Sequence, residues 1–266
     1  MIGMVEWHKF GLMNIFVEYI KYRWNARTLH GIHSPFIFDF MEKASKLRPN
    51  VRDEMAIKNF VFKQKRNRKK LEIKDYGAKS KKLDQYRSID QIFKTSSSFG
   101  KNGILLFRIC MHFKPQNILE LGTSIGMGSL YMHLGNPKSR LISIEGCPET
   151  HSIAKENLKT YPIELINNTF KNAIQTFSEE KFDLVFIDGH HNGKALLEYM
   201  DALMEYTHDN TIFVLDDIRW SHSMLDSWNK LSGAQTYHLS LDFFRMGVLV
   251  RRPQQVKENF ILRFKK

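Results

Sequence analysis

The chain has 266 residues, 42% of them hydrophobic, which is enough for one catalytic domain with an appended segment. Two cysteines, Cys110 and Cys147, exclude a disulfide-rich secreted scaffold and favour a reducing cytoplasm. The net charge of +12 is uneven, because residues 58–82 hold eleven Lys or Arg against two acids.

The first 95 residues read as helices and polar connections. Apolar residues recur at helical spacing in residues 5–24, and Glu18 and Lys21 interrupt their most apolar part. That part is too short to span a bilayer and no small-residue cleavage site follows it, so we expect no signal peptide and no membrane partner. Ser34 and Pro35 are typical of a helix start. Residues 63–82 are polar, basic and predicted to be exposed.

From residue 96 onward a loop and a buried helix, residues 103–113, lead into alternating strands and helices. The candidate strands are residues 117–121, 140–145, 163–167, 182–188, 211–217, 235–241 and 246–252. Helical patterns at 128–134, 148–160, 170–177 and 192–206 separate the first five. This alternation predicts a seven-stranded, mostly parallel α/β sheet with helices on both faces. The short link around Phe244 and Arg245 predicts a C-terminal antiparallel hairpin. We therefore divide the chain into a helical extension, 1–95, and a catalytic domain, 96–266.

A glycine-rich turn follows the first of these strands. Glu120 ends an apolar run, and Gly122, Gly126 and Gly128 follow it in the order E-x-G-x-x-x-G-x-G. A dinucleotide-binding turn needs G-x-G-x-x-G, but Ser124 stands where its second glycine would be. Glycines here let the backbone approach a ligand, and Glu120 can meet a cationic amino group. A generic strand-to-helix turn is the alternative.

A second acid ends the next strand. Glu145 lies 25 residues after Glu120, and Pro148 opens the following helix. A carboxylate at this position can accept hydrogen bonds from both hydroxyls of an adenosine ribose. The alternative is an acid that only favours the helix N-terminus. Asn168 or Thr169, after the third strand, could contact the adenine edge or simply form a turn.

From Ser97 to Arg252 the chain resembles class I S-adenosylmethionine-dependent methyltransferases, and specifically bacterial O-methyltransferases near the catechol and caffeoyl-coenzyme-A types. The segments that carry the resemblance are ILELGTSIGMGS, IEGCPET, FDLVFIDGHH and VLDDIRWS. It implies a Rossmann-like, doubly wound fold and S-adenosylmethionine as the methyl donor. The residues that it assigns to donor binding are Glu120, Gly122, Thr123, Ser124, Gly126, Gly128, Glu145, Gly146, Asn168 and Asp188.

Three acids follow the fourth and fifth strands. Asp188 ends the fourth strand, and Asp216 and Asp217 end the fifth. Because the carboxyl ends of parallel strands share one edge, this is an oxygen-rich cluster that suits Mg²⁺ or another divalent cation. The resemblance implies that the metal would orient two acceptor oxygens and activate a hydroxyl. Alternatively, Asp188 contacts the donor and Asp216 caps a turn.

The candidate base follows Asp188 directly. Metal-dependent relatives often carry a lysine three residues after the first acid, whereas this chain has His191 there. Histidine can accept a proton near neutral pH, so His191 is a candidate base and His190 is its rival. Trp220 could line the acceptor pocket or pack the loop onto the next helix.

The sequence thus predicts an enzyme that methylates an oxygen of a small-molecule acceptor in the cytoplasm. One alternative is an RNA methyltransferase that uses the basic segment 58–82. The chain lacks, however, the (D/N)-P-P-(Y/F) motif of amino-directed nucleic-acid enzymes after its fourth strand. Another alternative is a non-catalytic protein that binds the donor and a partner. The sequence leaves a homodimer open.

Overall fold

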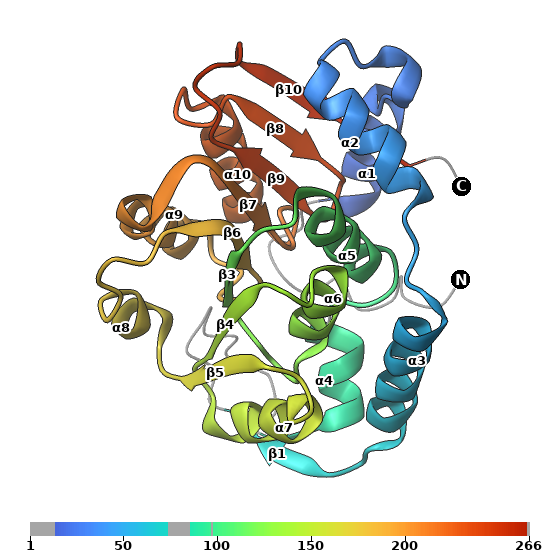
Figure 1. Ribbon diagram of the computed structural model, residues 1–266, viewed down its shortest axis with the longest axis vertical. Helices are drawn as coiled ribbons and strands as arrows, with labels where there is room; N and C mark the ends of the chain where they lie inside the picture. The colour runs from blue at the N-terminus through green and yellow to red at the C-terminus, as the bar shows by residue number, and fades with distance from the viewer. Residues whose placement is uncertain (1–13, 74–85, 97, 265–266) are drawn as a thin grey trace.

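A single sheet forms the centre of the protein. The computed structural model describes residues 14–73, 86–96 and 98–264 (Figure 1). Residues 5–13 of the first predicted helix and 74–82 of the basic segment lie outside the described residues. The sheet has the order β10-β8-β9-β7-β6-β3-β4-β5. Its strands are β3 (Asn117–Leu121), β4 (Arg140–Glu145), β5 (Ile163–Asn167), β6 (Phe182–Ile187), β7 (Thr207–Leu215), β8 (Leu239–Asp242), β9 (Gly247–Val250) and β10 (Glu258–Ile261).

The strand directions confirm the mostly parallel sheet and its C-terminal hairpin. The five strands β3 to β7 run parallel to one another, and β9 is antiparallel to both β7 and β8. The central sheet has eight strands among the described residues, however, not the seven predicted, because β10 adds to the edge parallel to β8. Its sequence, ENFI, is short and half polar, so only its pairing with β8 identifies it.

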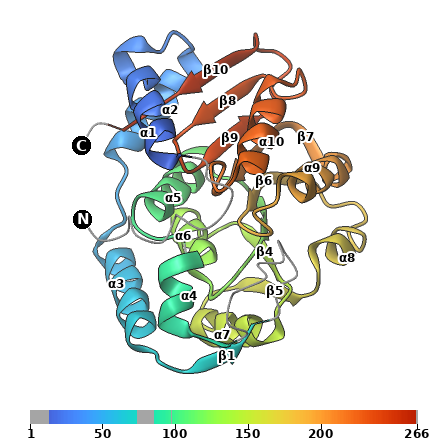
Figure 2. The same cartoon turned by 180° about the vertical axis from the view of Figure 1, so that it is seen from behind.

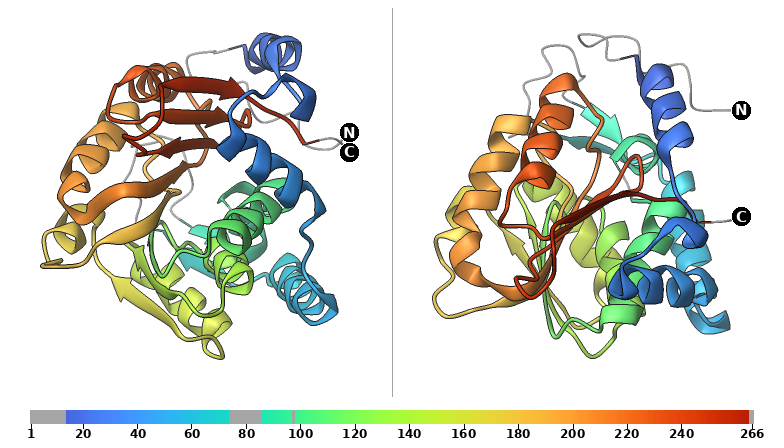
Figure 3. Two further views of the ribbon diagram at one scale, coloured as in Figure 1. Left: turned by 45° about the horizontal axis from the view of Figure 1, so that its top comes forward. Right: turned by 90° about the horizontal axis from the view of Figure 1, so that it is seen from above.

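Helices cover both faces of the sheet (Figure 3). One face carries α5 (Lys101–Phe113), α6 (Met127–Gly135) and α7 (Pro148–Leu158). The other carries α8 (Phe170–Ile174), α9 (Gly193–Ala202) and α10 (His222–Gly233). Each face of the sheet has its own hydrophobic core, and successive strand residues point into the two cores in turn. Ile118 packs in the core on the first face and Leu119 in the core on the second. The carboxyl ends of β3, β4, β6 and β7 therefore meet at one edge.

The N-terminal segment adds α1 (Ile15–Asn25), α2 (Pro35–Lys46), α3 (Val51–Arg66) and α4 (Ile89–Ser96) to the first face (Figure 2). The predicted helix start at Ser34 and Pro35 is confirmed, since α2 begins at Pro35. Two short strands, β1 (Lys70–Glu72) and β2 (Tyr86–Ser88), form a hairpin that was not predicted. No helix within the described ranges is long and apolar enough to cross a bilayer.

The extension shares its hydrophobic core with the sheet domain. Phe40 of α2 is fully buried and stacks on Phe113 of α5 at 5.1 Å between ring centroids. It also meets the edge of Phe264, beyond the last strand. The division into 1–95 and 96–266 stays a prediction, and these contacts indicate that the two parts stabilise each other.

Replacing Phe40 with alanine should therefore destabilise the whole domain. We expect Phe40→Ala to lower the free energy of unfolding by about 3–5 kcal/mol, the usual cost of removing a fully buried phenylalanine. Phe38 lies on the same helix but is 41% exposed, so Phe38→Ala serves as the matched control with a loss below about 1 kcal/mol. Urea denaturation of both variants measures the difference, and equal losses would contradict a shared core.

Candidate functional site

The glycine turn after β3 is shaped by close backbone contacts. Gly122 has φ +109°, and a Cβ there would lie 2.1 Å from the carbonyl oxygen of Asp188. Gly126 has φ +96° and directly precedes α6 as its N-cap residue. Only glycine combines these dihedral angles with this proximity at no steric cost. The amides of Gly122 and Thr123 both donate to the carbonyl of Ile144, which ties the turn to β4.

Glu145 is joined to the same turn through its side chain. One carboxylate oxygen accepts from the amide of Ser124 at 2.7 Å, and the other accepts from the amide of Cys147 at 2.9 Å. Ser124 adopts φ +50° to present its amide. The carboxylate is thus held rigidly at the carboxyl edge of the sheet, although burial raises its pKa against the effect of these hydrogen bonds.

The remaining predicted donor residues fall on either side of this pair. Asn168 donates its amide to the carbonyl of Glu145 at 3.2 Å, so the end of β5 adjoins the end of β4. Gly146 lies between, and its carbonyl accepts from the side chain of Asn167. Thr123 is buried, with its hydroxyl 2.5 Å from that of Ser143. The structure therefore brings Gly122, Thr123, Ser124, Gly126, Glu145, Gly146 and Asn168 together.

Glu120 points beneath the turn and not out of it. Its side chain is fully buried and accepts hydrogen bonds from Ser129 and Ser143. A Cβ at Gly128 would lie 2.4 Å from the other carboxylate oxygen, so that glycine makes room for the acid. Burial raises the pKa of Glu120 to about 7. Direct contact with a donor stays a prediction, whereas its packing supports the turn.

The three predicted acids do meet at the ends of β6 and β7. Asp188 accepts a hydrogen bond from the hydroxyl of Ser98 at 3.0 Å. Asp216 and Asp217 are buried, and Asp217 forms a bidentate pair with Arg245, at 2.5 Å to Nε and 3.1 Å to Nη2. Arg245 Nε is also 3.8 Å from Asp216. Sequence reasoning did not identify Arg245 as a site residue, because the pairing of β9 with β7 is what carries it there.

Burial and mutual repulsion shape the charges in this cluster. Burial, with the charge of Asp217, raises the pKa of Asp188 to about 7. The same two causes raise the pKa of Asp216, and one oxygen of Asp216 has no hydrogen-bond partner among the described residues. Burial alone would lower the pKa of Arg245. The negative charges of Asp217 and Asp216 outweigh that effect and raise the pKa. The guanidinium is therefore charged at any working pH.

The two histidines face different ways. His191 Nε2 lies 3.9 Å from Asp217, and its ring packs against Trp220 at 5.3 Å between centroids. His190 adopts φ +63°, and its Nδ1 is hydrogen bonded to the hydroxyl of Tyr199. Its ring also stacks on Tyr199, at 5.5 Å between ring centroids. Of the two candidate bases, His191 is the one beside the acidic cluster.

The arrangement fits a divalent metal poorly. Among the residues that the structure describes, no group of three His, Cys, Asp or Glu side chains converges to hold an ion. Instead the guanidinium of Arg245 is held within 4 Å of both Asp216 and Asp217. A metal that bound these carboxylates would have to displace a cation that the chain itself supplies.

The described part of the basic segment packs beside the start of α7, and some of its charges are paired. Lys63 of α3 contacts Glu156 of α7 at 2.9 Å, and Arg68 pairs with the buried Asp90. The Arg66 guanidinium stacks over Phe62. Residues 74–82 of this segment lie outside the described residues. Of the seven Lys and Arg residues described in this segment, three form ion pairs: Lys58, Lys63 and Arg68.

Comparison with known proteins identifies the domain. Residues 119–218 match a family model described as a methyltransferase domain. The chain is 28% identical over 139 residues to a catechol O-methyltransferase of Niastella koreensis. That match covers 49% of this chain and 61% of the relative, less than two thirds of the relative's length.

Two solved structures share the fold. One is an O-methyltransferase of Bacillus cereus in complex with SAH, with a TM-score of 0.51, 18% identity and coverage of 59% of this chain and 83% of that one. The other is an SAH-bound methyltransferase of Podospora anserina, with a TM-score of 0.53, 17% identity and coverage of 77% and 97%. Residues 119–218 thus match a methyltransferase-domain family, and the chain shares the fold of these methyltransferase structures, which confirms the resemblance found in its sequence.

The buried acid beneath the turn makes stability depend on pH. Its pKa is raised in the folded state, so between roughly pH 4.5 and 7 the folded protein binds more protons than the unfolded chain. Glu120 therefore costs stability as the pH rises through that window. We expect Glu120→Gln to reduce the loss of stability between pH 5 and pH 8 by on the order of 3 kcal/mol.

Urea denaturation at both pH values measures this loss. Glu54→Gln, at a glutamate whose side chain is 56% exposed, provides the matched control and should leave the loss unchanged. A Glu120→Gln variant whose stability falls between the two pH values as much as that of the unaltered protein would contradict the assignment.

Proposed function

We propose that the protein transfers a methyl group from S-adenosylmethionine to an oxygen of a small-molecule acceptor. One arrangement carries this proposal. The glycine turn and Glu145, the two features expected to bind the methyl donor, are hydrogen bonded to each other, and His191 lies beside Asp217 after the neighbouring strands. Named relatives with this fold act as O-methyltransferases, and two of the solved structures hold SAH. Because the matched relative is covered only in part, the activity itself is our inference.

The donor would lie across the carboxyl ends of β3 and β4. Gly122 and Ser124 allow its approach to the backbone, Glu145 would accept the ribose hydroxyls, and Asn168 adjoins the expected adenine position. Asp188 contacts the turn through its carbonyl, close to Gly122, and so would lie beside the methionine part. When bound, the donor supplies an electrophilic methyl group on a positively charged sulfur.

His191 is the group that we assign to proton removal. The acceptor hydroxyl would give its proton to His191 Nε2, and the resulting oxyanion would attack the methyl carbon as the carbon–sulfur bond breaks. The positive charge on the ring would then lie 3.9 Å from the carboxylate of Asp217. Trp220, 42% exposed and packed against His191, would form one wall of the acceptor pocket.

A divalent cation at Asp188, Asp216 and Asp217 remains the alternative that the resemblance suggests. It would polarise the acceptor oxygen as a Lewis acid. The bidentate pairing of Asp217 with Arg245 does not favour it, so no step here depends on a metal. We also favour the cytoplasm, because both cysteines are free and buried.

The first test is donor binding by calorimetry with SAH. We expect Glu145→Ala to weaken binding at least about tenfold, because a charge-assisted hydrogen bond to the ribose would be lost. Glu164→Ala is the matched control, since this glutamate lies on the neighbouring β5 with its side chain 51% exposed. Failure of the unaltered protein to bind SAH, or tighter binding of a nicotinamide dinucleotide, would refute the proposal.

The second test separates the two histidines. We expect His191→Asn to lower kcat about 100-fold or more, the usual contribution of a general base, while SAH binding persists. His190→Asn should retain most activity, since asparagine tolerates the left-handed backbone of that position. Methyl transfer from labelled donor, measured under single-turnover conditions, gives the comparison. The reverse order of effects would transfer the base role to His190.

A further inference from the structure

Arg245 lies where the acceptor would bind. One edge of its guanidinium group, formed by Nε and Nη2, donates hydrogen bonds to Asp217, whose side chain is only 5% exposed. The arginine side chain is itself 37% exposed, so the guanidinium sits between the buried acids and the open edge of the sheet. No acceptor among the described residues is bonded to Nη1. The end of the guanidinium, Nη1 with Nη2, is therefore available to a ligand.

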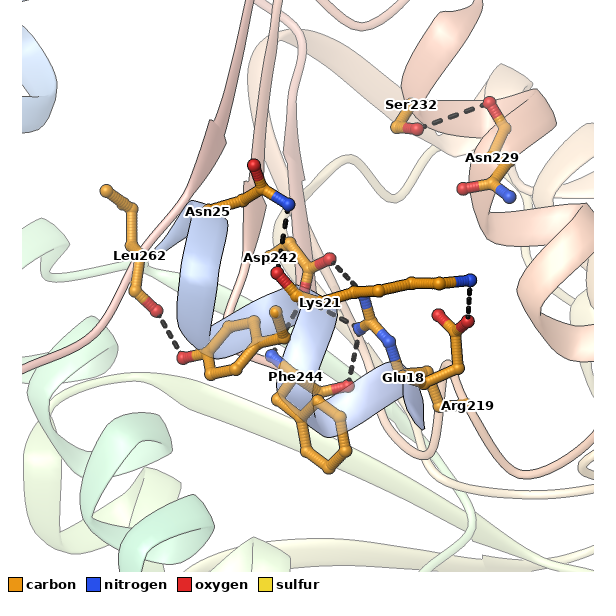
Figure 4. A network of polar contacts seen from close by, with 10 residues as sticks. Glu18, Lys21, Asn25, Arg219, Asn229, Ser232, Asp242, Phe244 and Leu262 are labelled. Atoms are coloured by element: carbon orange, nitrogen blue, oxygen red, sulfur yellow. Dashed lines mark hydrogen bonds and ion pairs between the residues drawn. The ribbon is translucent and has the colours of Figure 1, made fainter. Parts of the chain in front are cut away.

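Phe244, the residue before Arg245 in the turn, is held by hydrogen bonds with Arg219 and Asp242 (Figure 4). Arg219 donates to the carbonyl of Phe244 at 2.7 Å and forms a bidentate pair with Asp242. The amide of Phe244 in turn donates to Asp242, and its backbone has φ +73°. The rings of Tyr19 and Tyr22, from α1, pack on the Phe244 ring at 5.1 and 5.2 Å. Arg245 is thus preorganised by a buried ion pair and by the N-terminal helix.

The guanidinium and the candidate base flank one atom. Oδ2 of Asp217 lies 3.1 Å from Arg245 Nη2 and 3.9 Å from His191 Nε2. Asp216, buried beside them, has one oxygen that lacks a hydrogen-bond partner among the described residues and lies 3.8 Å from Arg245 Nε. An acceptor whose hydroxyl reaches His191 would therefore bring its neighbouring substituent to the free end of Arg245. Trp220 beside His191 suits a flat ring at that place.

We propose that Arg245 binds a carboxylate of the acceptor, so that the site takes an aromatic hydroxycarboxylate. This inference rests on the proposed function and names its acceptor class. A divalent ion would chelate two vicinal hydroxyl oxygens, whereas a guanidinium offers two parallel N–H donors that match a carboxylate. Arg245 would thus determine which acceptor binds, as a metal ion would otherwise do.

The test compares acids with their amides. The 2-, 3- and 4-hydroxybenzoates and the matching hydroxybenzamides are titrated into the full-length protein with a chelator present, with and without SAH. At least one acid should bind about tenfold or more tightly than its amide, the scale of a charge-assisted bidentate contact. Equal binding of every acid and its amide, or no binding by any acid, would overturn the proposal.

Variants assign the preference to one residue. Arg245→Gln should abolish the difference between acid and amide, and Arg245→Lys should retain part of it, because lysine keeps the charge but not the fork. Arg140→Gln, at an arginine whose side chain is 52% exposed on β4, is the matched control. If Arg245→Gln does not fold, the comparison of acid and amide in the unaltered protein still tests whether the site prefers a carboxylate. An unchanged preference in folded Arg245→Gln would refute the role of Arg245.

A metal titration gives an independent readout. We expect no stoichiometric Mn²⁺ binding by electron paramagnetic resonance, with or without SAH. A one-to-one site that disappears in Asp188→Asn would overturn the proposal in favour of a metal. Because SAH binding is measured separately, loss of donor binding would count against the proposed function, whereas loss of the acid preference counts against Arg245 alone.

Discussion

The ion pair between Arg245 and Asp217 is the interaction on which the site depends. Asp188, Asp216 and Asp217 meet at one edge of the sheet, and burying carboxylates together is costly unless a cation or protons compensate their charges. The guanidinium supplies the cation, and burial together with the charge of Asp217 raises the pKa of Asp188 and of Asp216, which favours their protonated forms. A covalently tethered cation has a high local concentration, so a free ion competes with it at a disadvantage.

This dependence gives the N-terminal extension a role in the site as well as in the core. In the turn that bears Arg245, Phe244 adopts a left-handed backbone conformation. This conformation costs free energy in any residue other than glycine. Arg219 and the rings of α1 hold that residue in place. The extension thus acts on the guanidinium through packing, from outside the domain that the sequence motifs define.

Local pattern predicted the ends of the parallel strands to within two residues, and the site residues lie at or just beyond those ends. Glu145 was identified because a residue that ends a parallel strand must lie at the shared edge, and His191 because it stands three residues after Asp188. Side chains along a strand alternate between the two faces of the sheet, so Glu120 lies on the same face as Ile118, under α6. This alternation alone indicates that the Glu120 side chain is buried. Arg245 and β10 could not be predicted in this way, because both depend on pairing between strands distant in the sequence.

The charges beneath the turn also explain why it suits a sulfonium donor and not a dinucleotide. A pyrophosphate binds at such a turn through free backbone amides at the start of the helix. Here the amide of Ser124 already donates to the carboxylate of Glu145, and Glu120 lies buried directly below. An anionic ligand would therefore lose a donor and meet two acids, whereas a ligand with a positive sulfur and a free amino group would be attracted by both.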